Sequence, residues 1–154
     1  MKIRITVGEK EKLNGYLNID PIAKFDDLSI DIRNLDDAVS DAECTEIISD
    51  GVIDFLNRQD LVVAMKNWVK KMRHGGKIVV TSIDALEVAK SFSRKKIDIE
   101  VFNRAIHGNF TEGWDVFLSH TTMEELSSLL GSLGLIVTKK RINGIKLIVE
   151  AKRP

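Results

Sequence analysis

The chain has 154 residues, of which 44% are hydrophobic and 30% are charged, a balance typical of globular proteins that excludes extensive disorder. Lys and Arg number 23, as do Asp and Glu, so the net charge is zero. A net charge of zero argues against a partner held mainly through neutralisation of its phosphates, so nucleic acid is not indicated. A neutral protein can still carry a local basic patch. The length predicts a single domain over residues 1–154.

The sequence also bears on the compartment. Cys44 is the single cysteine, so no internal disulfide can form, which fits a reducing environment. No apolar run approaches the roughly 20 residues needed to span a bilayer. The amino-terminal residues 1–5 are too short and too charged a run for a secretory signal. We therefore expect a cytoplasmic protein with no membrane partner.

Short runs rich in β-branched residues and bounded by Gly, Pro, Asn or Asp indicate strands. They lie at residues 3–7, 17–21, 29–32, 46–51, 77–83, 135–142 and 145–151. These runs predict a sheet of seven strands.

Four segments carry helical signals between these strands. The first covers about residues 59–72, has Asn57 as its cap and ends at Gly75-Gly76. The second begins at Asp84, with Glu87 completing a capping-box pattern. The third carries the apolar residues of segment 101–106, and the fourth begins at Thr121 or Thr122.

Strands that alternate with helices predict a mainly parallel sheet. The end of the chain departs from this pattern, because Asn143-Gly144 separates two strand-like runs by two residues and predicts an antiparallel hairpin. We expect six parallel strands, with residues 145–151 inserted antiparallel beside residues 135–142. A parallel sheet that ends in such a hairpin is unusual among dinucleotide-binding folds.

An ordered set of motifs resembles one family. The motifs are Thr6-Val7-Gly8-Glu9, residues 13–20 ending in Asn18-Ile19-Asp20, Asp31-Ile32-Arg33, residues 49–55, His74-Gly75-Gly76-Lys77, residues 102–108 and His120. Together they resemble the small class I S-adenosylmethionine-dependent methyltransferases of the predicted, type 11-like group, over almost the whole chain. The resemblance implies a Rossmann-like α/β fold, S-adenosylmethionine as cofactor and methyl transfer to an unidentified acceptor. Two departures stand out: the loop after the first strand keeps only Gly8, and the family's His-x-x-Glu-His element is absent.

The resemblance places a cofactor site at the ends of the early strands. An acidic residue there can accept the ribose hydroxyls, and Asp20 holds that position, where we expect it to be exposed. Asp31 and Ile32 are expected at the adenine. The remaining cofactor residues are Val7, Gly8 and Glu9 after the first strand and Ser49, Asp50 and Gly51 after the fourth. The alternatives stay open that Asp20-Pro21 and Asp50-Gly51 are plain turns and that Asp31 and Ile32 are ordinary loop and core residues.

We expect the segment 102–120 to cover the acceptor side, because long irregular segments are often functional. The acceptor-side residues are Asp54, Arg104, His107, Trp114 and His120. The histidines have no metal-ligand spacing, so no metal is predicted, and no catalytic residue is assigned. A non-catalytic binding module with a degenerate methyltransferase fold is the main alternative. A NAD(P) enzyme is disfavoured because Gly-x-Gly-x-x-Gly is absent.

Overall fold

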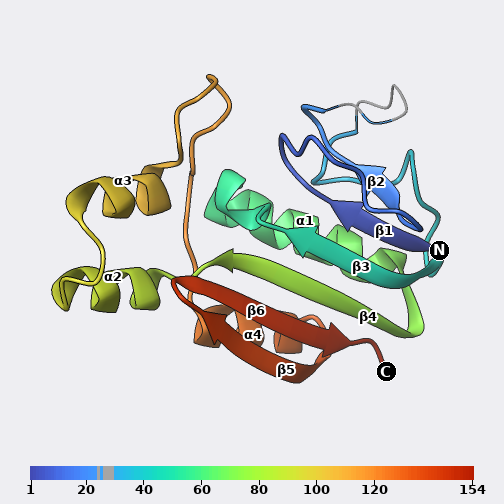
Figure 1. Cartoon of the computed structure of the whole chain (residues 1–154). Coiled ribbons are helices and arrows are strands. Elements are labelled where there is room, and N and C mark those ends of the chain that lie inside the picture. The colour runs from blue at the N-terminus through green and yellow to red at the C-terminus, as the bar shows by residue number, and fades with distance from the viewer. Residues whose placement is uncertain (24, 26–29) are drawn as a thin grey trace.

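The computed structural model describes residues 1–23, 25 and 30–154 as a sheet with helices packed against it (Figure 1). The strands are β1 (Lys2–Ile5), β2 (Leu17–Ile19), β3 (Cys44–Asp50), β4 (Met72–Ile83), β5 (Ile136–Asn143) and β6 (Lys146–Lys152). The helices are α1 (Arg58–Lys71), α2 (Ala85–Ser93), α3 (Ile99–His107) and α4 (Met123–Ser132). A 3-10 turn, η2 (Ile53–Phe55), leads from β3 towards α1.

The strand order across the sheet is β2-β1-β3-β4-β6-β5. The first four strands along the chain are parallel, and β6 is antiparallel to both β4 and β5. The predicted α/β fold, a mostly parallel sheet with a carboxyl-terminal antiparallel hairpin, is confirmed. The predicted insertion of the last strand is also confirmed, because β6 lies between β4 and β5.

The strand predicted at residues 29–32 is not present in the described part of the chain. Ser29 lies outside the described residues, and Ile30, Asp31 and Ile32 form no strand. The two isoleucines are buried in the hydrophobic core, and the carbonyl of Asp31 accepts a turn hydrogen bond from Asn34 N–H. These two isoleucines thus pack without pairing in the sheet, and the described residues form a sheet of six strands instead of the predicted seven.

The hairpin turn lies one residue later than predicted. Asn143 pairs with Lys146 within the ladder, so the two turn residues are Gly144 and Ile145. Gly144 has φ of 63°, and a glycine with positive φ at the first turn position is typical of a type II′ turn.

The helix starts agree with the predicted caps. The side chains of Asn57, Asp84 and Thr122 each accept a hydrogen bond from the N–H three residues on, at the starts of α1, α2 and α4. Helix α1 ends at Lys71, within one residue of the predicted end, but the predicted stop signal is wrong, because Gly75-Gly76 lies inside β4. Gly76 lies so close to β3 that a Cβ there would be 2.8 Å from the Cys44 carbonyl oxygen. The close approach of the two strands therefore accounts for a glycine at this position.

One continuous core joins the helices to one face of the sheet. The inward side chains of β1, β3, β4 and β6 pack against α1 and α4, and Trp68 at the centre is fully buried. Its indole N–H donates to the Ile32 carbonyl at 2.7 Å, so the polar atom of this large ring is satisfied. A smaller apolar cluster around Val88 and Ala105 joins α2 to α3.

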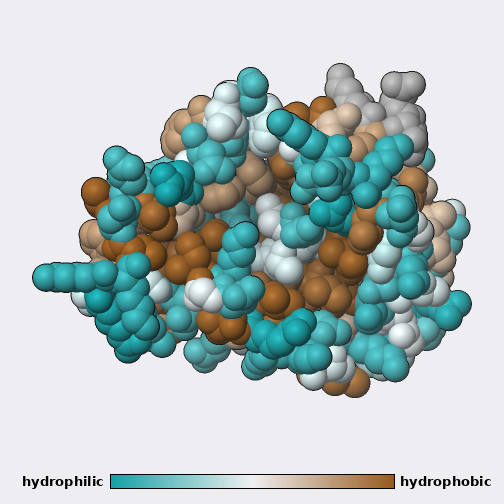
Figure 2. Space-filling model, viewed as in Figure 1, coloured by the Kyte–Doolittle hydropathy of each residue, from teal (hydrophilic) through white to brown (hydrophobic). Residues whose placement is uncertain are grey.

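No described helix covers the opposite face of the sheet, which faces the viewer in Figure 1. Arg4, Ile48, Val79 and Ile148 point to this side and are partly exposed. Figure 2 shows hydrophobic atoms along its middle, flanked by hydrophilic side chains. No helix in the described part of the chain is both long and apolar enough to span a bilayer.

Candidate functional site

The carboxyl ends of the parallel strands meet at one edge of the sheet. The loop after β1, the turn after β2, the end of β3 and the segment 108–120 all gather there (Figure 1). Ligands of open α/β sheets bind at this edge, where loops diverge from the strand ends. Residues 108–120 of the predicted segment 102–120 therefore lie at this edge, whereas residues 102–107 belong to α3.

Asp20 ties the first two loops together. Its side chain is 2% exposed, so the expectation of an exposed strand-end carboxylate is wrong. Oδ1 accepts hydrogen bonds from the backbone N–H groups of Gly8 (3.0 Å), Ile22 (2.8 Å) and Ala23 (2.9 Å). Oδ2 accepts from Glu9 N–H (2.9 Å) and the Thr6 hydroxyl (2.8 Å). A carboxylate has about four lone-pair positions, so none is left for a ribose in this conformation.

These bonds also set the ionisation of Asp20. Burial alone would raise its pKa, but the backbone N–H donors outweigh burial and hold the pKa below its ordinary value. Asp20 is thus a charged structural group that fixes the loop after β1 against the turn after β2.

Gly8 is needed both for its backbone conformation and for the space beside it. Its φ is 72°, a conformation that favours glycine. A Cβ at this position would lie 2.1 Å from the Trp114 ring. Trp114 of the segment 108–120 therefore packs directly on the Gly8 backbone and closes over the loop after β1.

A hollow of about 710 Å³, here named the loop hollow, opens beside this contact. Its lining residues come from the loop after β1, the turn after β2 and the segment 108–120: Gly8, Glu9, Lys10, Ile22, Ala23, Phe25, Thr111, Glu112 and Trp114. The volume lies within the range of small-molecule sites. Segments far apart in the sequence thus build one concave site.

A second and smaller hollow, the strand-end hollow, lies beyond β3 and has a volume of about 170 Å³. It is lined by Asp50, Gly51, Asp54, Thr81, Ser82, Ile83, Phe117 and Lys146. The buried Asp54 carboxylate accepts from the Ser82 hydroxyl at 3.0 Å and lies 3.2 Å from His120 Nδ1. His120 Nε2 faces the Ile106 carbonyl oxygen at 2.6 Å. Both ring nitrogens therefore face acceptors, an arrangement that suits the doubly protonated imidazolium.

The environment of His120 favours that charged form. Burial alone would lower its pKa, but the hydrogen bonds to Asp54 and to the Ile106 carbonyl outweigh burial and raise the pKa above its ordinary value of 6.5. The backbone N–H of Leu118 also donates to the Asp54 carbonyl at 2.8 Å. The end of the segment 108–120 is thus fastened to η2.

Arg4 and Asp50 lie between the two hollows. The Arg4 guanidinium donates to Asp50 at 2.8 Å and lies 3.7 Å from Glu9. Asp50 also accepts from the Thr81 hydroxyl at 3.2 Å. This group of charges connects Glu9 of the loop hollow with Asp50 of the strand-end hollow.

Solved methyltransferase structures share this arrangement of elements. A chain from the complex of the Haloferax volcanii Trm112 methyltransferase activator with a putative methyltransferase matches with a TM-score of 0.66 and 10% identity, over 99% of this chain and 82% of its own. A Methanosarcina mazei S-adenosylmethionine-dependent methyltransferase matches with a TM-score of 0.61 and 12% identity, over 92% and 70%. The Burkholderia thailandensis 1,6-didemethyltoxoflavin-N1-methyltransferase, solved with S-adenosylhomocysteine, matches with a TM-score of 0.56 and 12% identity.

The chain has the fold of the class I S-adenosylmethionine-dependent methyltransferases. It covers 52% of the length of the Burkholderia enzyme, with 90% of its own length matched. No family model and no curated protein matches the sequence. At these identities the likeness establishes the methyltransferase fold alone.

Within this methyltransferase fold, several predicted cofactor residues gather and others do not. Gly8 and Glu9 line the loop hollow, while Asp50 and Gly51 line the strand-end hollow. The side chain of Ile32, expected at an adenine, is buried in the hydrophobic core and lines neither hollow. The others lie outside both hollows: Val7 packs against the core, Asp31 is paired with Arg33, and Ser49 is fully buried.

The residues expected on the acceptor side divide in a similar way. Asp54 lines the strand-end hollow with His120 bonded to it, whereas Trp114 lines the loop hollow. Arg104 and His107 are exposed on α3 and line neither hollow. Among the described residues, no group of three or more His, Cys, Asp or Glu is placed to hold a metal ion.

Sequence reasoning did not single out several residues of this edge, among them the polar residues Arg4, Thr81 and Ser82. Arg4 is a charged residue inside an apolar strand, and Thr81-Ser82 are polar residues at the carboxyl end of β4. Polar residues at the ends of parallel strands are the signal that would have found them.

We predict that Asp20→Asn destabilises the protein by roughly 2–4 kcal/mol, because an amide nitrogen would face buried N–H donors. Since the folded-state pKa is lowered, Asp20 stabilises the protein above its unfolded pKa of about 3.9. This contribution is lost as the pH falls through the folded value. Chemical denaturation at neutral and acidic pH measures both effects. The control Asp37→Asn, at an exposed site, should stay within about 0.5 kcal/mol; equal effects of the two changes would contradict this role of Asp20.

We also predict a pH-dependent contribution from His120. Because the folded-state pKa is raised, its stabilising effect is complete below the unfolded pKa of about 6.5 and is lost as the pH rises through the folded value. His120→Gln should flatten the fall in melting temperature between about pH 6 and pH 9, a fall we expect to be about 2–4 °C. His107→Gln, at an exposed site, is the control. An unchanged pH profile in His120→Gln would rule out His120 as the titrating group.

Proposed function

We propose that the protein binds S-adenosylmethionine in the loop hollow and transfers its methyl group to an acceptor held at the strand-end hollow. The observation that carries this proposal is the pair of hollows at the carboxyl edge of a methyltransferase sheet. One segment serves both, because Trp114 lines the first and His120 holds Asp54 of the second.

The loop hollow suits a ligand with a positive charge and a flat ring. Glu9 and Glu112 supply carboxylates, while Phe25 and Trp114 supply aromatic surface. S-adenosylmethionine carries a sulfonium cation, an adenine and a ribose, so charge and shape both match. Lys10 also lines this hollow, and we assign to it the carboxylate of the methionyl group.

The carboxylates of Glu9 and Asp20 have different roles in this proposal. Because Asp20 has no free lone pair, we assign the ribose contact to Glu9, whose side chain is 40% exposed. One oxygen of Glu9 accepts from the backbone N–H of Lys10 at 2.8 Å, while the other is turned towards Arg4. Asp20 is then a positioning residue, since it holds the Gly8 and Glu9 backbone in place.

The bound cofactor supplies an electrophilic methyl group. Alignment of donor and acceptor is the main task left to the protein, and in model reactions it is worth up to about 7–11 kcal/mol. In this proposal Asp54 binds and orients the acceptor, and His120 keeps Asp54 in place. Arg104 and His107 are outer residues of the acceptor side.

A non-catalytic binding module is the second candidate. The Trp114 ring packs against Gly8 of the loop after β1, on the loop that a bound cofactor would be expected to contact. The hydrogen bonds from Gly8 and Glu9 to Asp20 hold this loop in that conformation. These observations favour a protein that holds a ligand or partner with this edge and carries out no transfer.

Isothermal titration with S-adenosylmethionine, S-adenosylhomocysteine and NAD tests the proposal. We expect both sulfur compounds to bind and NAD not to bind, because the loop after β1 lacks the glycines that cradle a pyrophosphate. If neither S-adenosylmethionine nor S-adenosylhomocysteine binds, the proposed function is rejected. The remaining candidate is then a non-catalytic module that binds a partner.

We predict that Glu9→Gln weakens S-adenosylmethionine binding about three- to tenfold, because it removes a negative charge beside a cationic ligand. The glutamine oxygen still accepts from the loop backbone, so the melting temperature should change little. The control Glu11→Gln removes the same charge from an exposed residue outside the loop hollow. Equal loss in the two variants would show that the ribose is not bound by Glu9.

A further inference from the structure

Basic side chains are unevenly distributed in this neutral protein. Residues 1–60 contain seven Lys and Arg against 14 Asp and Glu, whereas residues 61–154 contain 16 against nine. The excess of positive charge collects on the turn between α2 and α3 and on the β5–β6 hairpin. Figure 2 shows hydrophilic side chains together with hydrophobic patches over the end of the molecule where Figure 1 places α2 and α3.

Most of these cations have no carboxylate partner among the described residues, unlike most of those near β1 and α1, although Lys90 pairs with Glu87 and Lys139 with Glu150. Arg4, Arg33 and Lys71 each form ion pairs with carboxylates. Within residues 1–23, 25 and 30–154, no carboxylate lies within 4.0 Å of the following exposed residues: Arg94, Lys95, Lys96, Lys140, Arg141 and Lys146. Charges of one sign that lack partners create a positive potential, which draws anionic partners.

The backbone of the α2–α3 turn points to a function for one of these residues. Lys96 N–H donates to the Ser91 carbonyl and Lys95 N–H to the Phe92 carbonyl, which is the Schellman arrangement. Lys95 therefore occupies the position that usually holds glycine, and its φ is 57°. A residue kept in an unfavourable conformation suggests that its side chain serves a purpose other than stability.

Helix α4 ends in the same arrangement and provides an internal comparison. Leu135 N–H donates to the Leu130 carbonyl and Gly134 N–H to the Gly131 carbonyl. Here the left-handed position is held by Gly134, with φ of 84°. The same chain thus uses glycine at one Schellman turn and lysine at the other.

Two hollows flank the α2–α3 turn. One, of about 680 Å³, combines Lys95 and Lys96 with the partly exposed ring of Phe92. Its single carboxylate, Asp98, caps α3 by accepting from Val101 N–H. The other, of about 300 Å³, brings Lys90, Arg94 and Lys96 against Gly144 and Ile145 of the hairpin turn. Glu87 also lines it, at 3.7 Å from Lys90.

We infer that the α2–α3 turn and the β5–β6 hairpin bind a single-stranded nucleic acid. Cations that track phosphates beside an aromatic ring that stacks on a base are the usual means of binding such strands. The hollows favour a flexible strand over a membrane surface, because a bilayer contacts flat or convex faces. The proposal does not depend on cofactor binding.

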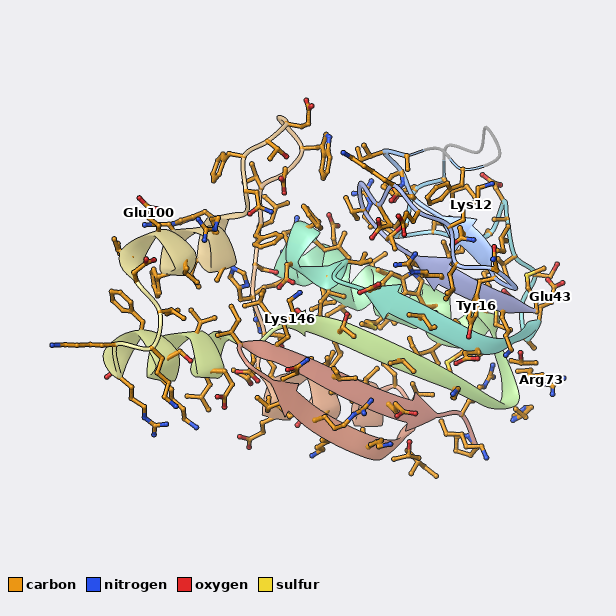
Figure 3. All side chains as sticks on the ribbon, viewed as in Figure 1. Lys12, Tyr16, Glu43, Arg73, Glu100 and Lys146 are labelled. Atoms are coloured by element: carbon orange, nitrogen blue, oxygen red, sulfur yellow. The ribbon has the colours of Figure 1, made fainter. Side chains whose placement is uncertain are left out.

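The position of Lys146 connects this surface to the ligand edge of the sheet. Figure 3 shows Lys146 at the start of β6, near the base of α2. Lys146 also lines the strand-end hollow. A strand held on the basic surface would therefore pass close to that hollow.

Fluorescence anisotropy with a labelled oligonucleotide of about 15 nucleotides tests the proposal without cofactor. We expect micromolar binding at about 50 mM NaCl, and a logarithmic salt slope near −3 if about four phosphates are contacted. RNA and DNA forms of one sequence identify the sugar preference. Tighter binding of the duplex, no binding at about 100 μM protein, or equal binding of polyglutamate or phosphatidylserine vesicles would each overturn the proposal.

Lys95→Gly gives the sharpest variant, because the proposal predicts opposite effects on stability and binding. Glycine suits the left-handed turn, so the melting temperature should rise by roughly 2–4 °C. Loss of one phosphate contact should weaken oligonucleotide binding about three- to fivefold and reduce the salt slope by about 0.7. Phe92→Leu, which keeps the apolar contact with α3, should weaken binding about fivefold through lost stacking.

Lys66→Gln is the matched control, since it removes one exposed charge from α1, away from the turn. It should leave affinity within about twofold. If Lys66→Gln and Lys95→Gly weaken binding equally, the interaction is a general effect of charge and the assigned surface is wrong. A more stable Lys95→Gly protein with unchanged affinity would also reject it.

Discussion

The buried carboxylate of Asp20 accepts hydrogen bonds from both loops that border the loop hollow, and the rest of the ligand edge depends on this arrangement. The loop after β1 has few glycines and no helix of its own to hold it. A charged acceptor supplies that order, because hydrogen bonds to an ionised group are about twice as strong as neutral ones. With the Gly8 backbone fixed, Trp114 can occupy the space that a Cβ at this position would fill.

The segment 108–120 couples the two hollows. Trp114 packs against Gly8 near one end, and His120 is bonded to Asp54 at the other. Phe117 lies between them and forms edge contacts with the rings of Phe55 and His120. These contacts lie on one short segment, so the same stretch of chain contributes to the surroundings of both hollows.

Local signals in the sequence accounted for the features that short-range physics determines. The caps Asn57, Asp84 and Thr122 were found because their acceptors and donors lie three residues apart. The antiparallel hairpin was found from its turn, with an error of one residue. The strand predicted at residues 29–32 was wrong because the alternating apolar residues Ile30 and Ile32 are buried in the core without pairing in the sheet.

The site was less predictable because its bonds join distant segments. Asp20 precedes a proline, a context that equally fits a turn or a ligand contact, and only the fold shows donors converging on it from residues 6–9 and 22–23. The net charge of zero also gave no sign that acidic and basic residues occupy different regions, because a total charge carries no information on the positions of the charges. That separation suits two ligands of opposite charge. The proposed cationic cofactor would lie beside Glu9 and Glu112, and the proposed anionic strand beside Arg94, Lys95 and Lys96, so the charge of each region is opposite to that of its proposed ligand.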